Sequence, residues 1–261
     1  MPPHLGRGDQ LQGGSLRRAR PGATRGRDPW HVTRAFIDLH CHTSASFDCL
    51  SRPGDVVRAA AARGLTHLVI TDHDRIDGAL AARDEAPGGL TVIVGQEVRT
   101  SEGDLVCAFI ERAIPPGLSA ADTVAAAREQ GALVGIPHPF DRWRGSLLRD
   151  ARMASLVAQV DWVETHNARV VGGGNQRAAE FAHEHGRPGV AVSDAHSILE
   201  VGVAYTALDG DPSTPAGLLA ALADVELVPG RASFTIRLWT PVAKLVQRAR
   251  GNGRIGPATL G

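Results

Sequence analysis

The feature that most constrains the fold is a regular alternation, from residue 35 onward, of short apolar runs with Ala- and Arg-rich segments of helical period. The apolar runs predict strands at 35–40, 67–72, 90–98, 132–137, 161–166 and 189–194, with a further candidate at 225–230. The segments between them predict helices at 53–63, 77–86, 119–130, 147–158, 175–185 and 214–223. Strands and helices that alternate in this way are typical of parallel βαβ units. Because there are six or seven such units, we expect an α/β fold that closes, or nearly closes, into a single-domain barrel.

Three segments depart from this alternation. A second apolar run at 104–110 follows the strand at 90–98 across a short turn, which predicts a hairpin return. Residues 1–34 are rich in Gly, Pro and Arg and show no period, so we expect a disordered basic leader before a domain at 35–230. Residues 231–261 are expected to form a C-terminal tail with one short amphipathic helix.

Composition argues against several classes of protein. The 28 Lys and Arg residues balance the 28 Asp and Glu residues, whereas a general binder of nucleic acid or anionic membranes needs a positive field. Three cysteines are too few for a disulfide scaffold, which favours a reducing compartment. No apolar run approaches the roughly 20 residues of a membrane span, and the N-terminal segment lacks the apolar core of a signal peptide. We therefore expect a soluble, cytoplasmic protein.

The histidines gather where predicted strands end. Of 11 histidines, six lie at or just beyond the carboxyl ends of strands: His40, His42, His73, His138, His166 and His196. Carboxylates accompany them: Asp38, Asp48, Asp72, Asp74, Glu97 and Asp194. The carboxyl ends of barrel strands open onto one face, so these side chains should converge there. Imidazole with carboxylate is a ligand set for Zn, Mn or Fe, and so many groups imply more than one metal ion.

Single motifs leave structural alternatives open. His40 and His42 are two apart on an extended segment and should point to the same side, which suits chelation, although two hydrogen-bonded surface imidazoles would share this spacing. Glu97 ends an apolar strand, where an unpaired carboxylate is costly to bury, so a ligand role is favoured. His138 lies between two prolines, in a turn that could be purely structural.

Taken in order, the motifs resemble those of the polymerase-and-histidinol-phosphatase (PHP) superfamily over residues 35–210. They are HxH (His40, His42), TDH (Asp72, His73), GxE (Glu97), PHP (His138) and SDAH (Asp194, His196). The segments IPPGLS, IPHPFDR and HNAR further resemble stand-alone PHP phosphoesterases with a PHP-associated C-terminal segment. This resemblance implies a distorted (β/α)7 TIM-like barrel with a trinuclear metal centre that hydrolyses phosphoesters.

The resemblance also implies a ligand set. It assigns His40, His42, Glu97 and Asp194 to a first metal ion, and it makes Glu97 the bridge to a second ion bound by His138. A third ion is assigned to Asp48, His73 and His196. Mixed imidazole and carboxylate sites accept Mn, Zn or Fe, so the expected cofactors are three divalent ions of unassigned identity.

Two positions depart from the family pattern. Histidinol phosphatases of the family carry His where this chain has Asp48, which disfavours that substrate and favours a nucleotide-type one. The second metal's other histidine is replaced by Asp104, which either ligates a hard cation such as Mn²⁺ or leaves the second site weak and empty.

The implied mechanism is attack on phosphorus by a water that neighbouring cations activate. Asp72 would orient ligands and Glu97 would bridge two ions. His196 or His138 could protonate the leaving group, but metal ligation would occupy one ring nitrogen, so no general acid is assigned. Guanidinium groups bind phosphate in bidentate fashion, so Arg142 or Arg144, together with Arg169, is assigned to the substrate. Asn167 is assigned to the substrate too, while His166 could be a ligand, a substrate contact or a stacking residue.

The sequence thus predicts a hydrolase acting on a small phosphomonoester, with three alternatives. An exonuclease or phosphodiesterase acting on RNA or DNA ends would use the same chemistry and the basic leader, but 4% aromatic residues offer few stacking platforms. An amidohydrolase-like enzyme is disfavoured because the one lysine, Lys244, lies beyond the last predicted strand. A non-catalytic metal-binding module is disfavoured because nearly all expected ligand types are present.

Overall fold

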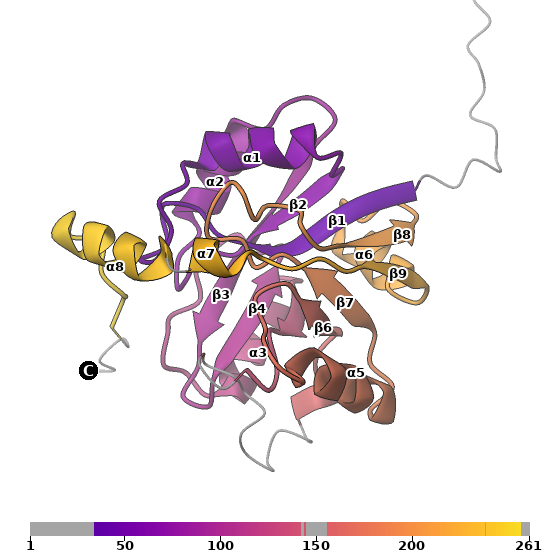
Figure 1. The fold of residues 1–261 in the computed structure, drawn as a ribbon. Coiled ribbons are helices and arrows are strands. Elements are labelled where there is room, and N and C mark those ends of the chain that lie inside the picture. Colours follow the sequence, from indigo (N-terminus) through magenta and orange to yellow (C-terminus); the bar gives the residue numbers. More distant parts are fainter. Residues whose placement is uncertain (1–33, 142–143, 145–155, 238, 257–261) are drawn as a thin grey trace, which may run out of the picture. The chain divides into compact units, whose positions relative to one another are not determined.

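The computed structural model describes residues 34–141, 144, 156–237 and 239–256 (Figure 1). Residues 1–33 of the predicted leader, Arg142 and most of the predicted helix at 147–158 lie outside the described residues. Arg34, the last residue of the predicted leader, begins the first strand.

One nine-stranded sheet organises the described part of the chain, in the order β7-β6-β5-β4-β3-β2-β1-β8-β9. Its strands are β1 (Arg34–Cys41), β2 (His67–Ile70), β3 (Thr91–Arg99), β4 (Asp104–Ala108), β5 (Leu133–Ile136), β6 (Trp162–Asn167), β7 (Gly189–Val192), β8 (Tyr205–Asp209) and β9 (Val225–Val228). A bridge between Cys41 and Ala195 brings the end of β7 back to β1. The predicted α/β fold with a nearly closed, barrel-like sheet is therefore confirmed.

The strand directions refine the prediction. Strands β1, β2 and β3 are parallel to one another, and so are β5, β6 and β7. Strand β4 is antiparallel to both neighbours, which confirms the hairpin predicted at 104–110. Strand β8 was not predicted; it pairs antiparallel with β1 and with β9, so the sheet is mixed rather than built only from parallel units.

Helices alternate with many of the strands, and a capping residue explains where two of the helices begin. The helices are α1 (Pro53–Ala62), α2 (Asp77–Asp84), α3 (Ala120–Arg128), α5 (Gly174–Glu184), α6 (Pro215–Ala221), α7 (Phe234–Arg237) and α8 (Trp239–Ala249). Ser119 caps α3 by accepting a hydrogen bond from the amide of Asp122, and Thr214 caps α6 through Gly217. Among the described residues, no helix combines the length and apolar character that crossing a bilayer requires.

Successive residues of a strand point to opposite faces of the sheet, and the core follows this rule. In β2, Leu68 and Ile70 join an apolar cluster that includes Val56 of α1, whereas Val69 joins the cluster on the other face. The second cluster contains the fully buried Trp162. Its indole lies against Gly135 of the adjacent strand, where a Cβ would come within 2.1 Å of the ring, so only glycine fits. Packed cores on both faces leave the strand ends to carry the polar side chains.

Candidate metal centre

The polar residues of the strand ends converge on a cavity of about 500 Å³. Its walls come from segments that are far apart in the sequence, including the last helix. The lining residues are Phe47, Asp48, His73, Glu97, Asp104, His138, Arg144, Arg169, Asp194, His196, Thr240, Pro241, Lys244 and Arg254.

The first group of candidate ligands is His40, His42 and Asp194. The Nε2 atoms of the two histidines lie 2.9 Å apart, so the side chains do point to the same side as their spacing predicts. Asp194 Oδ1 lies 3.7 Å from each of these nitrogen atoms. All three side chains are buried, at 1% exposure or less.

Glu97 stands at the centre of the site. Its Oε2 atom lies 3.3 Å from His40 Nε2, 3.4 Å from His42 Nε2 and 3.1 Å from His73 Nδ1. Its Oε1 atom lies 3.0 Å from His138 Nε2. Burial acts to raise the pKa of Glu97, but His73 and His40 outweigh it and hold the pKa well below its ordinary value. A carboxylate with its two oxygens on different histidine groups has the geometry of a bridging ligand.

Asp104 joins Glu97 and His138 in a second group. The hairpin pairs Arg99 with Asp104 and Glu97 with Val106, which brings Asp104 to the same end of the sheet as Glu97. Burial and the nearby Glu97 carboxylate raise the pKa of Asp104 to about 6. One ligand atom from each of Asp104, Glu97 and His138 lies within 4.8 Å of the others, and two buried carboxylates at this separation favour a cation between them.

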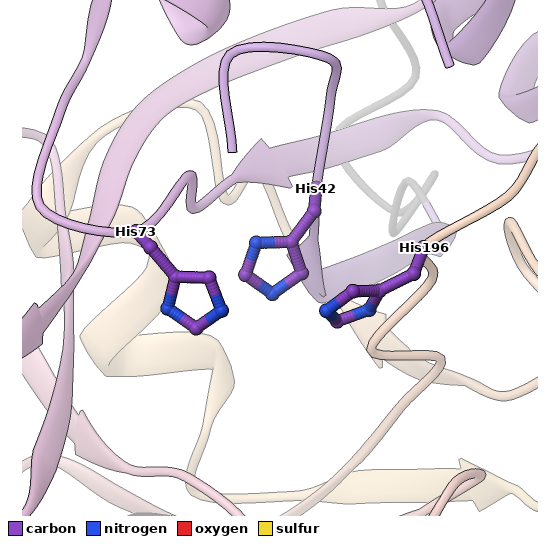
Figure 2. Close-up of side chains that lie close together, drawn as sticks. All are labelled: His42, His73 and His196. Carbon is purple, nitrogen blue, oxygen red and sulfur yellow. The ribbon is translucent and has the colours of Figure 1, made fainter. Parts of the chain in front are cut away.

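The third group is His42, His73 and His196, whose rings face one another (Figure 2). The ring centroid of His42 lies 4.6 Å from that of His73 and 4.3 Å from that of His196. Burial and the neighbouring imidazoles of His196 and His73 lower the pKa of His42 well below its ordinary value. Asp48 Oδ2 lies 3.5 Å from Nε2 of His73 and of His196, so Asp48 completes this group.

Asp72 positions these ligands without lining the cavity. It is fully buried and accepts hydrogen bonds from the amide of Thr43 at 2.7 Å, the hydroxyl of Thr43 at 2.6 Å and the hydroxyl of Ser46 at 2.8 Å. Ser46 Oγ in turn lies 3.1 Å from Nδ1 of His42. Asp72 therefore acts on the His42 ring through Ser46.

Three observations show that the site fits divalent cations. In each of the three groups described above, one ligand atom from every residue lies within 4.8 Å of the others. Among the described residues, buried atoms of the candidate ligands have no hydrogen-bond partner: Asp48 Oδ1, His138 Nδ1 and Asp194 Oδ1. His138 and Asp194 also adopt positive φ angles, 28° and 52°, which cost about 1–3 kcal/mol each and concentrate at functional sites.

Two arginines share the cavity with the candidate ligands. Arg144 forms an ion pair with Asp194 and another, at 2.9 Å, with Asp141. Arg169 is almost buried, and its guanidinium donates a hydrogen bond to Thr240 Oγ1 at 2.7 Å. Both guanidinium groups therefore lie beside the candidate metal ligands.

The two other residues assigned to the substrate lie elsewhere. His166 Nε2 is 2.7 Å from the carbonyl oxygen of Gly230 and does not line the cavity. Asn167 is fully buried and donates hydrogen bonds to Glu164 at 2.8 Å and to Asp194 at 2.9 Å. Asn167 is thus placed to orient the candidate ligand Asp194 from behind. Arg142 lies outside the described residues.

Sequence reasoning missed several residues of the site. Glu164, which lies behind His40 in the buried strand β6, could have been found by the argument applied to Glu97, since an isolated carboxylate in an apolar strand needs a partner. Phe47, Lys244 and Arg254 also line the cavity. The sequence carries no local pattern for the last two, because only the packing of the C-terminal segment brings them to the strand ends.

Comparison with known protein families gives two adjacent matches. The family model of the PHP domain matches residues 38–153, and the model described as PHP-associated matches residues 172–225. Together they cover most of the strands and all of the candidate ligands.

The chain is also similar to individual proteins and to a solved structure. An uncharacterized protein of Methanocaldococcus jannaschii is 30% identical over 173 residues, which make up 65% of this chain and 68% of that protein. A 5′-3′ exoribonuclease of Haemophilus influenzae is 33% identical over 117 residues, or 40% of this chain and 42% of that enzyme. In fold, the chain is similar to a two-domain protein of Bacteroides vulgatus that contains a predicted PHP-like metal-dependent phosphoesterase. The TM-score is 0.64 at 19% identity, over 76% of this chain and 66% of that one.

Proposed function

The chain belongs to the PHP family, and from this premise we propose that it is a metal-dependent phosphatase acting on a small, nucleotide-type phosphomonoester. It has the fold of PHP-like metal-dependent phosphoesterases. The observation that supports the proposal most strongly is the position of Glu97, whose two oxygens contact histidines of all three candidate metal groups. Arg144 and Arg169 on the same cavity supply the charge that a phosphoryl group requires.

Three divalent ions are proposed as the cofactors, chosen among Mn, Zn and Fe. The first would be held by His40, His42 and Asp194, and the second by Asp104 and His138, with Glu97 between them. The third would be held by Asp48, His73 and His196. Bound at these positions, the ions would activate a water and offset the charge of the phosphoryl oxygens.

The protein's own residues hold the substrate and the ligands. Arg144 already reaches the carboxylate of Asp194, so its guanidinium lies within reach of a phosphoryl group bound beside that ligand. Arg169 is held by Thr240 and lies 3.7 Å from Glu200 Oε1, which restricts the rotation of its side chain. Two fixed guanidinium groups bind phosphoryl oxygens with little loss of side-chain entropy.

His196 serves as a ligand in this proposal rather than as a proton donor. Its Nδ1 lies 2.9 Å from the carbonyl oxygen of Asp194, and its Nε2 faces Asp48. Both ring nitrogens of His196 are therefore engaged, which favours a ligand role over proton donation to the leaving oxygen.

Phosphate release from a panel of substrates tests the proposal. The panel contains nucleoside monophosphates and sugar phosphates, each assayed with protein loaded with Mn²⁺, Zn²⁺ or Fe²⁺ and with protein treated with EDTA. We expect metal-dependent release that is fastest from nucleoside monophosphates. Faster release from sugar phosphates would reject the nucleotide-type substrate, and no release from any monoester would reject the phosphatase.

An exonuclease acting on RNA or DNA ends is the second candidate, and the similarity to the Haemophilus influenzae exoribonuclease favours it. The same ligands and arginines would serve a phosphodiester. Shortening of end-labelled oligonucleotides, measured at several salt concentrations, tests this candidate. A nuclease that contacts several phosphates should bind less tightly as the salt concentration rises. If the oligonucleotides stay intact while monoesters are hydrolysed, the nuclease is excluded.

A further inference from the structure

The end of the chain forms part of the cavity wall, although it follows the family-matched ranges. Those matches end at residue 225, while the segment 239–256 begins with α8. Four residues of this segment line the cavity: Thr240, Pro241, Lys244 and Arg254. This wall is therefore a property of the present chain that the family matches do not describe.

Gln247 fixes α8 to the loop that carries Asp48. Its side chain is 2% exposed. Its Nε2 atom donates to the carbonyl oxygens of Ser44 at 2.7 Å, Ser46 at 3.0 Å and Cys49 at 2.6 Å. A buried amide shared among three carbonyls of one loop holds the helix in a single register.

Asn252 provides a second attachment just beyond the helix. Its Nδ2 atom donates to the carbonyl oxygens of Ser44 at 3.2 Å and Ala45 at 3.0 Å, and its Oδ1 atom accepts from Arg75 at 2.8 Å. Arg99 in addition donates to the carbonyl oxygen of Ile255 at 2.8 Å. The segment is thus anchored on both sides of Arg254.

The anchored segment places two cations beside Phe47. Lys244 Nζ lies 5.4 Å from the centroid of the Phe47 ring, and the guanidinium carbon of Arg254 lies 4.9 Å from it. The centroid of the Phe47 ring also lies 5.0 Å from the ring centroid of His73, one of the candidate ligands. Lys244 Nζ is 4.0 Å from Asp48 Oδ2, at the outer limit of an ion pair, so an incoming anion can compete for it.

These cations are separate from the pair already assigned to the reacting phosphoryl group. Arg144 is paired with Asp194, and Arg169 is held by Thr240, whereas Lys244 and Arg254 flank Phe47. We propose that Lys244 and Arg254 form an anion subsite for a second anionic group of the substrate. This proposal rests on the proposed phosphatase function and narrows its substrate to molecules with two anionic groups.

Kinetics on matched substrates test the subsite. The two substrates of a pair are esters of the same alcohol. One carries a single phosphoryl group, and the other carries that phosphoryl group and a second anionic group. The second group is a phosphoryl group in one pair and a carboxylate in another pair. We expect Lys244→Met and Arg254→Gln each to lower kcat/KM about tenfold or more for the doubly anionic substrate, mainly through KM. For the singly anionic substrate, kcat/KM should change little in either variant. The control is Arg248→Gln, which removes an exposed cation from the same helix but not from the cavity.

The single lysine allows a readout that needs no turnover. In EDTA-treated full-length protein, trinitrobenzenesulfonate should modify Lys244 more slowly when the doubly anionic compound is present, as measured by mass spectrometry of the Lys244 peptide. This protection should weaken in Arg254→Gln and persist in Arg248→Gln. Equal labelling rates with and without the compound, or equal kinetics in the variants and the control, would overturn the subsite. If no monoester is hydrolysed, the phosphatase proposal fails, while the labelling still decides whether the subsite exists.

Discussion

Glu164 Oε1 lies 2.6 Å from Nδ1 of His40, and both side chains are fully enclosed by protein. Burial acts against the charged imidazole, but the carboxylates of Glu164, Asp194 and Glu97 outweigh it and raise the pKa of His40 well above its ordinary value. Glu164 also accepts a hydrogen bond from the amide of His138 at 2.8 Å. One carboxylate of β6 thus orients candidate ligands that belong to two other segments of the chain.

Replacing this carboxylate should weaken metal binding. We expect Glu164→Gln to fold normally but to bind Mn²⁺ about 10- to 100-fold more weakly, because partners behind a ligating histidine tune its basicity and orientation. Isothermal titration calorimetry measures the affinity, and Glu180→Gln, on the exposed face of α5, serves as the matched control. An affinity equal to that of the control would show that Glu164 does not support the ligand.

Asp104 carries a prediction about metal stoichiometry. If Asp104 ligates the second ion, Asp104→Asn should lower the metal content of the protein by one ion per chain, because the amide is a weaker ligand than the carboxylate. Inductively coupled plasma mass spectrometry after dialysis measures the content, with Asp224→Asn as an exposed control. An unchanged content would mean that Asp104 is not a ligand.

Outside the site, His67 links stability to pH. Its Nε2 lies 3.0 Å from Ser213 Oγ, and burial lowers its pKa below the ordinary 6.5. The unfolded chain therefore takes up this proton first as the pH falls, so the folded state loses stability below about pH 6.5. We expect thermal melting between pH 7.5 and 5 to show a smaller loss in His67→Gln than in wild type. An equal loss of melting temperature between pH 7.5 and 5 in the two proteins would show that His67 does not contribute to the pH dependence of stability.

Gln247 should contribute to stability as well as to the cavity wall. Gln247→Ala leaves the carbonyl oxygen of Cys49 without its side-chain donor and removes one of the two amides that donate to Ser44, which costs about 1–3 kcal/mol. Urea denaturation should show this loss, whereas Gln176→Ala, on an exposed helical surface, should change the free energy of unfolding by less than about 0.5 kcal/mol. Equal effects of the two substitutions would mean that α8 is not anchored through Gln247.

Much of the barrel could be predicted from the sequence because its strands and helices have clear periods. Strand β8 is the exception: its five residues, Tyr205–Asp209, have no helix before them and pair antiparallel with β1. The pattern of βαβ units therefore does not anticipate it. The register that brings Asp104 beside Glu97 likewise follows from hairpin pairing rather than from either residue alone.

The candidate ligands could be predicted because strand ends converge by geometry, whatever the intervening sequence. His40 and His42 illustrate this, since two-residue spacing on an extended segment fixes their common side. Lys244 could not be placed in the same way: it lies on α8, and its position depends on buried amides that contact a loop about 200 residues earlier. His166 lies in β6, next to the last residue of that strand, yet its ring contacts the carbonyl oxygen of Gly230 instead of the cavity.

The most direct test of the account is phosphate release from nucleoside monophosphates by the Mn²⁺-loaded wild-type protein and its His40→Ala variant. The control is His183→Ala, which removes an exposed histidine of α5. We predict release by wild type and control, with a loss of about 100-fold or more in His40→Ala, because the group of His40, His42 and Asp194 loses one of its two imidazoles. Full metal-dependent turnover by His40→Ala would contradict the proposed centre.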